Sequence, residues 1–209
     1  MAAVHSAEAF FKLAAARHSV YPLTKTLPAG VTSQRIHQIV KQTFQNTPSS
    51  FNSQPTRAVV LFGNEHDKLW DHTRSTLRAI VKDDEAWKGT AARMDLFKGA
   101  AGTVLFFNDE EVTKGMQEKF ALYADKFPHW ADQATGMHEY VAWTALAAEG
   151  VGANLQHYNP LIDDFVRDTW NIPKTWTLDA QLVFGGRPAE ETEAKPKNPS
   201  DDVIKAYGA

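Results

Sequence analysis

Residues 135–160, TGMHEYVAWTALAAEGVGANLQHYNP, decide the fold of this chain. A helix that starts near Thr135 places apolar residues on one face, at i, i+3, i+4, i+7, i+8 and i+11: Met137, Tyr140, Val141, Thr144, Ala145 and Ala148. Trp143 and Leu146 make the opposite face apolar too, and a helix that is apolar all round is buried on all sides. We therefore expect this helix to pack on a sheet by one face and on a partner subunit by the other.

The segment after this helix combines small and polar residues. The helix should stop at Gly150, because glycine takes the left-handed conformation of a helix C-terminus without strain. Val151–Tyr158 then reads as a loop that mixes small residues with amides and an imidazole. Small residues let a backbone approach a flat ligand closely, so the loop is a candidate binding segment. An ordinary core helix with a capped end explains the same composition equally well.

Composition limits the class of protein. The 209 residues are enough for one domain with a hydrophobic core, and a hydrophobic content of 43% is typical of a globular chain. A net charge of -3 gives no basic bias, which argues against nucleic acid as a partner. The absence of cysteine excludes disulfides and cysteine-ligated zinc. We expect a single domain over residues 1–209.

The apolar runs are all short. None approaches the roughly 20 residues of a membrane-spanning helix, so no membrane association is expected. The N-terminus, MAAVHSAEAFFKLAAARHS, lacks the apolar core and cleavage pattern of a signal peptide. The sequence therefore predicts a soluble, cytoplasmic protein.

Two polar segments stand out in the N-terminal quarter. Arg17-His18-Ser19 follows a helix that Ser6 can cap, and this combination suits a phosphate or a polyol because arginine binds oxyanions through two hydrogen bonds. The segment 48–55, PSSFNSQP, offers many donors and acceptors that match the edge of a heteroaromatic ring. Solvated surface in the first case and simple turn chemistry in the second remain alternatives.

The rest of the chain alternates helical and strand patterns. Strands are predicted at TRAVVLF (56–62), TVLFFN (103–108) and AQLVF (180–184). Helices are predicted over 33–46, 65–82 and 161–170. Two further helices are predicted to start at residues 83 and 109. Phe120, Tyr123, Phe127 and Trp130 form an aromatic group that indicates core or lid packing.

Several motifs fail on inspection. Gly150-Val-Gly152 is only the start of a dinucleotide-binding fingerprint and follows a helix instead of a strand. His138-Glu139 begins like a zinc-protease motif, but Ala142 stands where the second histidine is needed. Neither a nucleophile elbow nor a phosphate-binding loop is present. No metal site and no protein nucleophile are therefore expected.

The order of these segments, with Gly185-Gly-Arg-Pro188 and Lys195-Pro-Lys197 after them, resembles the nitroreductase superfamily. The loops SSFNSQPTR and EGVGANLQHYNP look most like the branch that includes the fatty-acid-repression-mutant proteins of fungi and their bacterial relatives. The resemblance covers nearly the whole chain. It implies an α+β fold with a mainly antiparallel central sheet flanked by helices. It also implies a domain-swapped homodimer with an FMN at each of two sites in the interface.

The resemblance also assigns candidate cofactor-binding residues. For the FMN phosphate and ribityl chain they are Arg17, His18 and Ser19. For the loop that reaches the flavin from the partner subunit they are Pro48, Ser49, Ser50, Asn52 and Gln54. For the loop that faces flavin N5 they are Leu155, Gln156 and His157. For the basic pair that closes on the phosphate they are Lys195 and Lys197.

One position departs from the family. Many members carry a second basic residue just after the N-terminal Arg-x-Ser, where this chain has Val20 and Tyr21. Positive charge near flavin N1/O2 must then come from elsewhere, with Arg93 and Lys98 as candidates. The tail from 190 to 209 is expected to embrace the partner as an arm, with Val203-Ile204 as an added strand.

The implied function is that of an FMN-dependent oxidoreductase. NADH or NADPH would donate electrons, and a nitroaromatic or another flat, small aromatic acceptor would receive them in a ping-pong mechanism. The flavin carries the redox chemistry in such a protein, and the chain binds and orients it. The alternatives are a non-catalytic flavin or ligand sensor on the same fold, a flavin-dependent dehalogenase or dehydrogenase, and a plain interaction protein.

Overall fold

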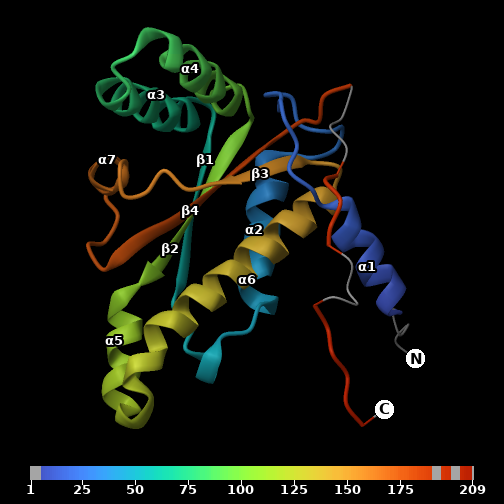
Figure 1. The fold of residues 1–209 in the computed structure, drawn as a ribbon, viewed down its shortest axis with the longest axis vertical. Helices are drawn as coiled ribbons and strands as arrows, with labels where there is room; N and C mark the ends of the chain where they lie inside the picture. The colour runs from blue at the N-terminus through green and yellow to red at the C-terminus, as the bar shows by residue number, and fades with distance from the viewer. Residues whose placement is uncertain (1–5, 190–193, 199–202, 209) are drawn as a thin grey trace.

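The computed structural model describes residues 6–189, 194–198 and 203–208. Within them, four strands form one antiparallel sheet in the order β1-β2-β4-β3 (Figure 1). The strands are β1 (Thr56–Phe62), β2 (Gly102–Asp109), β3 (Gly152–Gln156) and β4 (Trp176–Gly185). Helices cover both faces, so the α+β fold with a mainly antiparallel sheet is confirmed.

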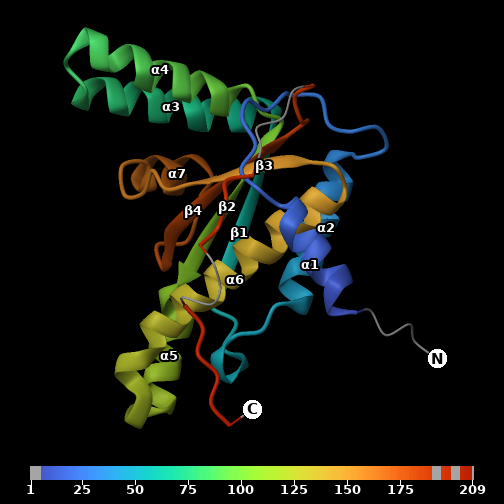
Figure 2. The same ribbon diagram turned by 45° about the vertical axis from the view of Figure 1, so that its right-hand side comes forward.

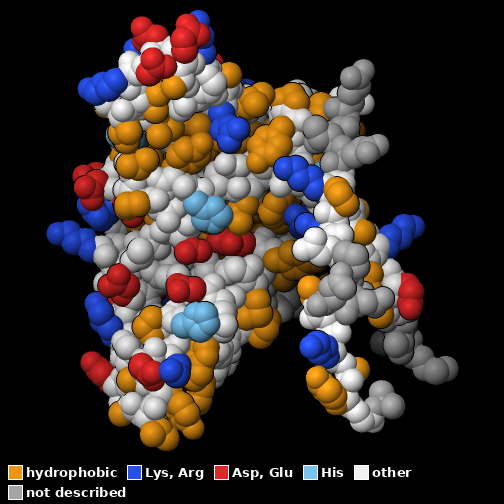
Figure 3. Space-filling view, in the orientation of Figure 1, with side chains coloured by type: hydrophobic (Ala, Val, Ile, Leu, Met, Phe, Trp, Pro, Cys, Tyr) orange, Lys and Arg blue, Asp and Glu red, His pale blue; other side chains and the backbone are white. Residues whose placement is uncertain are grey.

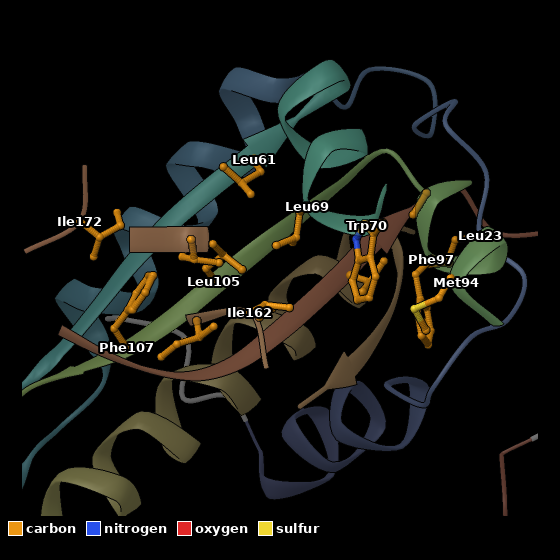
Figure 4. Packing of buried hydrophobic residues seen from close by; sticks show 14 of the residues in the cluster. Leu23, Leu61, Leu69, Trp70, Met94, Phe97, Leu105, Phe107, Ile162 and Ile172 are labelled. Atoms are coloured by element: carbon orange, nitrogen blue, oxygen red, sulfur yellow. The ribbon is translucent and has the colours of Figure 1, made fainter. Parts of the chain in front are cut away.

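The sheet is buried on both faces because its central strands are apolar on both. Side chains alternate along a strand, so Val104 and Phe106 of β2 pack on one side while Leu105 and Phe107 pack on the other. The first face is covered by α2 (Ser33–Asn46) and α6 (Phe127–Ala148). The second is covered by α3 (Gly63–Ile80), α4 (Asp84–Lys98) and α7 (Asp163–Thr169). The labelled side chains of Figure 4 belong to this second cluster.

The remaining helices lie at the ends of α6. Near its C-terminal half lies α1 (Ala7–Ala16), and beside its start lie α5 (Glu110–Lys119) and the 3₁₀ segment η2 (Ala121–Lys126). Figures 1 and 2 show α3 and α4 side by side at one end of the molecule and α5 at the other. A short 3₁₀ turn, η1 (Ser50–Asn52), precedes β1.

The long helix begins earlier than the sequence pattern predicts. Helix α6 starts at Phe127 instead of near Thr135, with Pro128 in its first turn. Proline suits this position because its missing N–H would have no partner inside the helix there. The predicted helix end is correct, since Gly150 follows with φ +76°. The aromatic group is therefore partly the first turn of α6.

The sequence pattern leaves open which face of α6 meets the sheet, and the structure decides it. The residues that face the core are Ala131, Ala134, Thr135, His138, Glu139, Ala142 and Leu146. The predicted apolar stripe lies on the outer side, where Met137 and Tyr140 are 39% and 38% exposed. Periodicity finds the stripes of a helix but does not say which one faces the sheet. The outer stripe leaves an apolar helix face without cover in the described part of this chain.

The segment predicted as a loop, Val151–Tyr158, contains a strand. Residues Gly152–Gln156 form β3 and pair with Gly185–Gln181 of β4. Glycine, alanine and asparagine are poor strand formers, so the local sequence gives no strand signal. The neighbouring strand imposes the extended conformation by supplying hydrogen-bond partners. β4 also begins four residues earlier than the predicted strand 180–184.

The C-terminal tail makes no strand in the residues described. Residues 194–198 and 203–208 are exposed, including Val203 and Ile204 at 69% and 66%. Residues 190–193, 199–202 and 209 of the predicted arm lie outside the described part of the chain. Among the described helices, none has the length and apolar character needed to cross a membrane.

Candidate cofactor site

The Arg17–Ser19 segment lies against the outer edge of β3. Ser19 forms a parallel bridge with Ala153, and the Val20 N–H donates to Ala153 O over 3.1 Å. The Asn154 amide adds a hydrogen bond to Val20 O at 3.1 Å. Two of the four predicted binding segments, 17–19 and 155–157, are thereby brought together, although they are about 140 positions apart in the sequence.

Beyond this bridge the edge of β3 is open. Backbone groups alternate in direction along an antiparallel strand, so Leu155 points its N–H and C=O outward, as Ala153 does. No described strand pairs with that side of Leu155. An open strand edge is a ready row of donors and acceptors, and it lies next to Ser19. The edge can bind the polar rim of a flat heteroaromatic ring.

The Arg17 side chain lies on aromatic residues of α6. Its guanidinium carbon is 4.4 Å from the centroid of the Trp143 ring and 5.8 Å from that of Tyr140. Arg17 Nε and Trp143 Nε1 are both buried and have no hydrogen-bond partner among the described residues. Buried donors are normally paired, so these two indicate a missing acceptor. A phosphate or another anion is the chemistry that an arginine fork accepts.

The loop before β1 is strained and is held at the other end of α6. Phe51, Asn52 and Gln54 all have φ between 52° and 55°, the left-handed region that bulky residues avoid. The Gln54 N–H donates to Ser49 Oγ over 2.8 Å. Phe51 is 52% exposed, yet its ring contacts four aromatic rings: Phe120, Tyr123, Phe127 and Trp130. Such strain occurs mostly where a loop has a functional task.

One chain does not bring this loop to the Arg17 segment. The loop is anchored at Trp130 and Arg17 is anchored at Trp143. Thirteen residues of α-helix separate these anchors, which corresponds to about 20 Å along the axis. A ring system of flavin size cannot contact both segments of the same chain. The predicted residues 48–54 and 17–19 therefore lie apart within one chain.

The other predicted residues lie as follows. Leu155, like Trp143, packs against the hydrophobic cluster on the α6 side of the sheet. Gln156 points to the opposite side, where its amide donates to Tyr21 Oη and Asn154 Oδ1, each at 2.9 Å. His157 is exposed. Lys195 and Lys197 are exposed too and form no ion pair within the described part of the chain.

The proposed sources of extra positive charge lie elsewhere. Arg93 and Lys98 are on α4, over the face of the sheet opposite α6, and Lys98 is bound to Asp71 over 2.7 Å. Arg187 is closer to the site, because it packs against Gly152 of β3. A Cβ on Gly152 would lie 3.1 Å from Arg187 Cγ and 3.3 Å from Val20 Cγ1. Sequence reasoning noted Arg187 only as part of a motif. The sequence signal for Arg187 is the pair of glycines directly before it, Gly185 and Gly186, which allows a close approach of the two chain segments.

Those glycines fix the course of the chain beside β3. A Cβ at Gly186 would lie 2.0 Å from Thr26 O, so only glycine fits there. Thr24 pairs with Gly186 in both directions through 3.0 Å hydrogen bonds. The close passage brings Val20, Leu23 and Arg187 around Gly152. The second feature that sequence reasoning missed is Trp143, whose role depends on its contact with Arg17.

Comparison with known proteins identifies the family. The profile described as the nitroreductase family matches residues 14–186, and the chain belongs to this family. Nitroreductase FRM2 of Saccharomyces cerevisiae is 38% identical over 193 residues, which cover 91% of this chain and 93% of the relative. HBN1 of the same yeast is 38% identical over 189 residues, or 89% and 93% of the two chains.

Solved structures agree with the fold. Nitroreductase CinD from Lactococcus lactis, in complex with chloramphenicol, superposes with a TM-score of 0.84 at 41% identity over 95% of this chain and 100% of that chain. A nitroreductase with bound FMN from Desulfitobacterium hafniense has a TM-score of 0.66 at 17% identity over 94% and 97% of the chains. FMN is thus a cofactor seen in the family, although this second likeness shows only the fold.

Proposed function

We propose that this protein is an FMN-dependent oxidoreductase that uses NADH or NADPH to reduce nitroaromatic or similar flat electrophilic acceptors. The observation that carries the proposal is the Arg17 guanidinium, which lies over the Trp143 ring and has a buried Nε without a hydrogen-bond partner among the described residues. Bound FMN would supply the redox chemistry, a two-electron transfer from a nicotinamide to an acceptor.

The residues of this chain fit the cofactor in three places. Arg17 and Ser19 would bind the phosphate and ribityl groups, since a guanidinium and a hydroxyl match an oxyanion and a polyol. The outward N–H and C=O of Leu155 would bind the polar edge of the ring. Arg187 would supply positive charge that the family often places after the Arg-x-Ser segment. Each role concerns binding and orientation, and none asks a side chain to act as nucleophile.

A homodimer would complete the site. In a two-fold dimer the same helix face meets its own copy, so two α6 helices packed antiparallel through Met137, Tyr140 and Val141 would bring the start of one beside the end of the other. The Phe51 loop of one chain would then approach Arg17 and Trp143 of its partner. The exposed apolar side chains of α1, Phe10 at 55% and Phe11 at 64%, support a further buried surface in such a dimer.

The tail is part of the same proposal. Lys195 and Lys197 are exposed cations with no ion-pair partner in the described residues, and both can close on a phosphate held by Arg17. Val203 and Ile204 can extend along the partner. The tail is too polar to form a core of its own. Contacts with the partner chain would therefore hold it in place.

The aromatic group around Phe51 supports a flat substrate. It presents a surface of stacked and tilted rings with Phe51 itself half-exposed. Aromatic faces favour planar, apolar ligands. A structure of CinD contains 4-nitrophenol, a nitroaromatic, which supports the same substrate class for a relative at 41% identity.

The test begins with the purified protein. We expect a yellow preparation whose FMN absorbance is bleached anaerobically by NADH or NADPH and restored by 4-nitrophenol or another nitroaromatic. Bound flavin that no nicotinamide reduces would favour the sensor alternative. A colourless protein that takes up no added FMN would contradict the proposal.

A further inference from the structure

Trp143 lies on the C-terminal half of α6, and its indole nitrogen is buried without an acceptor. Its ring packs against the hydrophobic cluster on the α6 side of the sheet, and Nε1 has no hydrogen-bond partner among the described residues. Trp70 shows the usual arrangement, because its Nε1 donates to Thr103 Oγ1 over 3.1 Å. Phenylalanine or leucine would pack on the same cluster without an unpaired donor. Stability therefore does not explain a tryptophan at position 143.

The face of this indole ring is covered by a cation. The Arg17 guanidinium carbon lies 4.4 Å from the centroid of the Trp143 ring and 5.8 Å from that of Tyr140, which precedes it by three residues on the same helix. A cation within about 6 Å of an aromatic centroid is attracted by the ring electrons, and tryptophan attracts it most strongly. The two rings together fix where the guanidinium lies.

The main chain around Arg17 is fixed as well. The Arg17 N–H donates to Leu13 O over 3.3 Å at the end of α1, and the Val20 N–H donates to Ala153 O over 3.1 Å. The long side chain of the arginine is therefore the part that could still move. A side chain loses rotamer freedom when a ligand fixes it, and a contact that holds it beforehand reduces that loss. The aromatic contact thus prepares the guanidinium for a ligand.

An aromatic ring holds an arginine differently from a carboxylate. Arg17 makes no ion pair with a described residue. Ion pairs with carboxylates are formed by Arg35, Arg57, Arg74, Arg78 and Arg167. Figure 3 shows acidic and basic side chains lying together in this way at the α3–α4 end of the molecule. A carboxylate occupies the N–H groups and neutralises the charge that an anion needs, whereas a ring leaves both available.

We propose that Trp143 is a positioning residue for the cofactor phosphate. Its ring holds the Arg17 guanidinium in place for a phosphate group, and the site thereby selects FMN over riboflavin, which has the same ring system but no phosphate. The inference rests on the proposed function, because it concerns the phosphate of FMN. Since Trp143 acts through Arg17, its loss should weaken binding of the phosphorylated flavin and leave binding of the flavin ring unchanged.

The test measures the affinity of the apoprotein for FMN and for riboflavin. Trp143→Leu removes the aromatic ring, and Trp143→Phe keeps a smaller one. We expect Trp143→Leu to bind FMN about tenfold more weakly than the wild type does. Its affinity for riboflavin should not change, and Trp143→Phe should fall between the two. Because both flavins carry the same ring system, the ratio of the two dissociation constants isolates the contribution of the phosphate.

Trp87 provides the matched control. It lies on α4, is partly buried as Trp143 is, and contacts Arg78 and Arg74 at 5.3 and 5.8 Å from its ring centroid. Trp87→Leu should keep the wild-type ratio of the two affinities. Urea unfolding adds a second readout, because Trp143→Phe removes an unpaired buried donor and should unfold at a midpoint close to that of the wild type.

Nuclear magnetic resonance of the isotope-labelled apoprotein gives a readout that needs no flavin. The Arg17 Nε–H signal, assigned by its absence in Arg17→Lys, should be displaced by the ring current of Trp143 and should shift when inorganic phosphate is added. In Trp143→Leu it should lose this displacement and respond only to higher phosphate concentrations.

Three results would overturn the inference. They are a wild-type ratio of FMN to riboflavin affinity in Trp143→Leu, an equal loss of affinity for both flavins, and a wild-type response of Trp143→Leu to phosphate. The second result would mean that Trp143 only supports the structure. Failure of the proposed function is distinct, because the wild type itself would then take up no FMN, while the phosphate titration would still report on Trp143.

Discussion

The guanidinium of Arg17 lies over the indole ring of Trp143, with its central carbon 4.4 Å from the ring centroid. The contact joins the end of α1 to the C-terminal half of α6 and orients the arginine before any ligand arrives. A cation over an indole ring is stabilised by the ring electrons, which fixes the charge without consuming its hydrogen bonds. Arg17 Nε is left buried without an acceptor in the described residues.

Replacement of Arg17 by alanine should weaken FMN binding. A charge-assisted hydrogen bond contributes about 1.5–3 kcal/mol, which corresponds to roughly 10- to 100-fold in dissociation constant. Flavin fluorescence titration of the apoprotein measures this change. Lys12→Ala, on the exposed face of α1, is the control and should bind FMN as the wild type does. Unchanged affinity in Arg17→Ala would mean that the phosphate binds elsewhere.

Steady-state kinetics should show a ping-pong pattern. If nicotinamide and acceptor use the same open face beside Leu155, one must leave before the other enters, and double-reciprocal plots at several fixed acceptor concentrations are parallel. An unreactive nicotinamide analogue that competes with NADH or NADPH should then also compete with the acceptor. Intersecting lines would show that both substrates bind together, which a single shared face does not allow.

Removal of the tail tests the dimer. A chain that ends after Pro188 lacks Lys195, Lys197 and the Val203-Ile204 pair, while the sheet up to Gly185 stays intact. We expect loss of FMN together with a shift toward monomer or aggregate in analytical ultracentrifugation. The double variant Lys195→Ala/Lys197→Ala separates the two roles and should lose FMN affinity but keep the dimer. A truncated protein that stays dimeric and yellow would contradict both roles of the tail.

His66 should make stability depend on pH. It is fully buried, its Nδ1 is 2.9 Å from Thr103 Oγ1, its Nε2 is 3.1 Å from Phe97 O, and burial lowers its pKa to about 4. His66 binds a proton near pH 6.5 in the unfolded chain, whereas in the folded chain it does so only near pH 4. The stabilisation is therefore complete above about pH 6.5 and is lost as pH falls toward 4, by up to about 3 kcal/mol.

Urea unfolding at several pH values checks this expectation. Glu139 acts in the opposite direction, because its raised pKa makes the folded state lose stability as pH rises from about 4.5 to 8. The contribution of His66 is isolated by comparison with His66→Gln, which should be less stable at pH 7 but show a weaker loss toward acid. His37→Gln, on the exposed side of α2, should follow the wild type. Equal slopes in wild type and His66→Gln would disprove the assignment.

The order of motifs in the sequence was sufficient to predict the family, the α+β class and three of the four strands. These features are local. The runs TRAVVLF and TVLFFN, the helix cap Ser6 and Gly150 at the helix end each act over a few residues and appear in the structure where the pattern placed them.

Contacts between distant segments decided the rest. The strand β3 exists because β4 supplies its partners, and its own residues give no strand signal. The side of α6 that faces the sheet depends on packing against β2, β3 and β4, which two apolar stripes of similar strength do not predict. Arg17 meets Trp143 and Arg187 passes close to Gly152 only after the sheet has formed. Sequence determined which chemical groups this protein has, and the tertiary structure decided which of them lie together, because proximity between residues far apart in the sequence is set by the sheet that joins their segments.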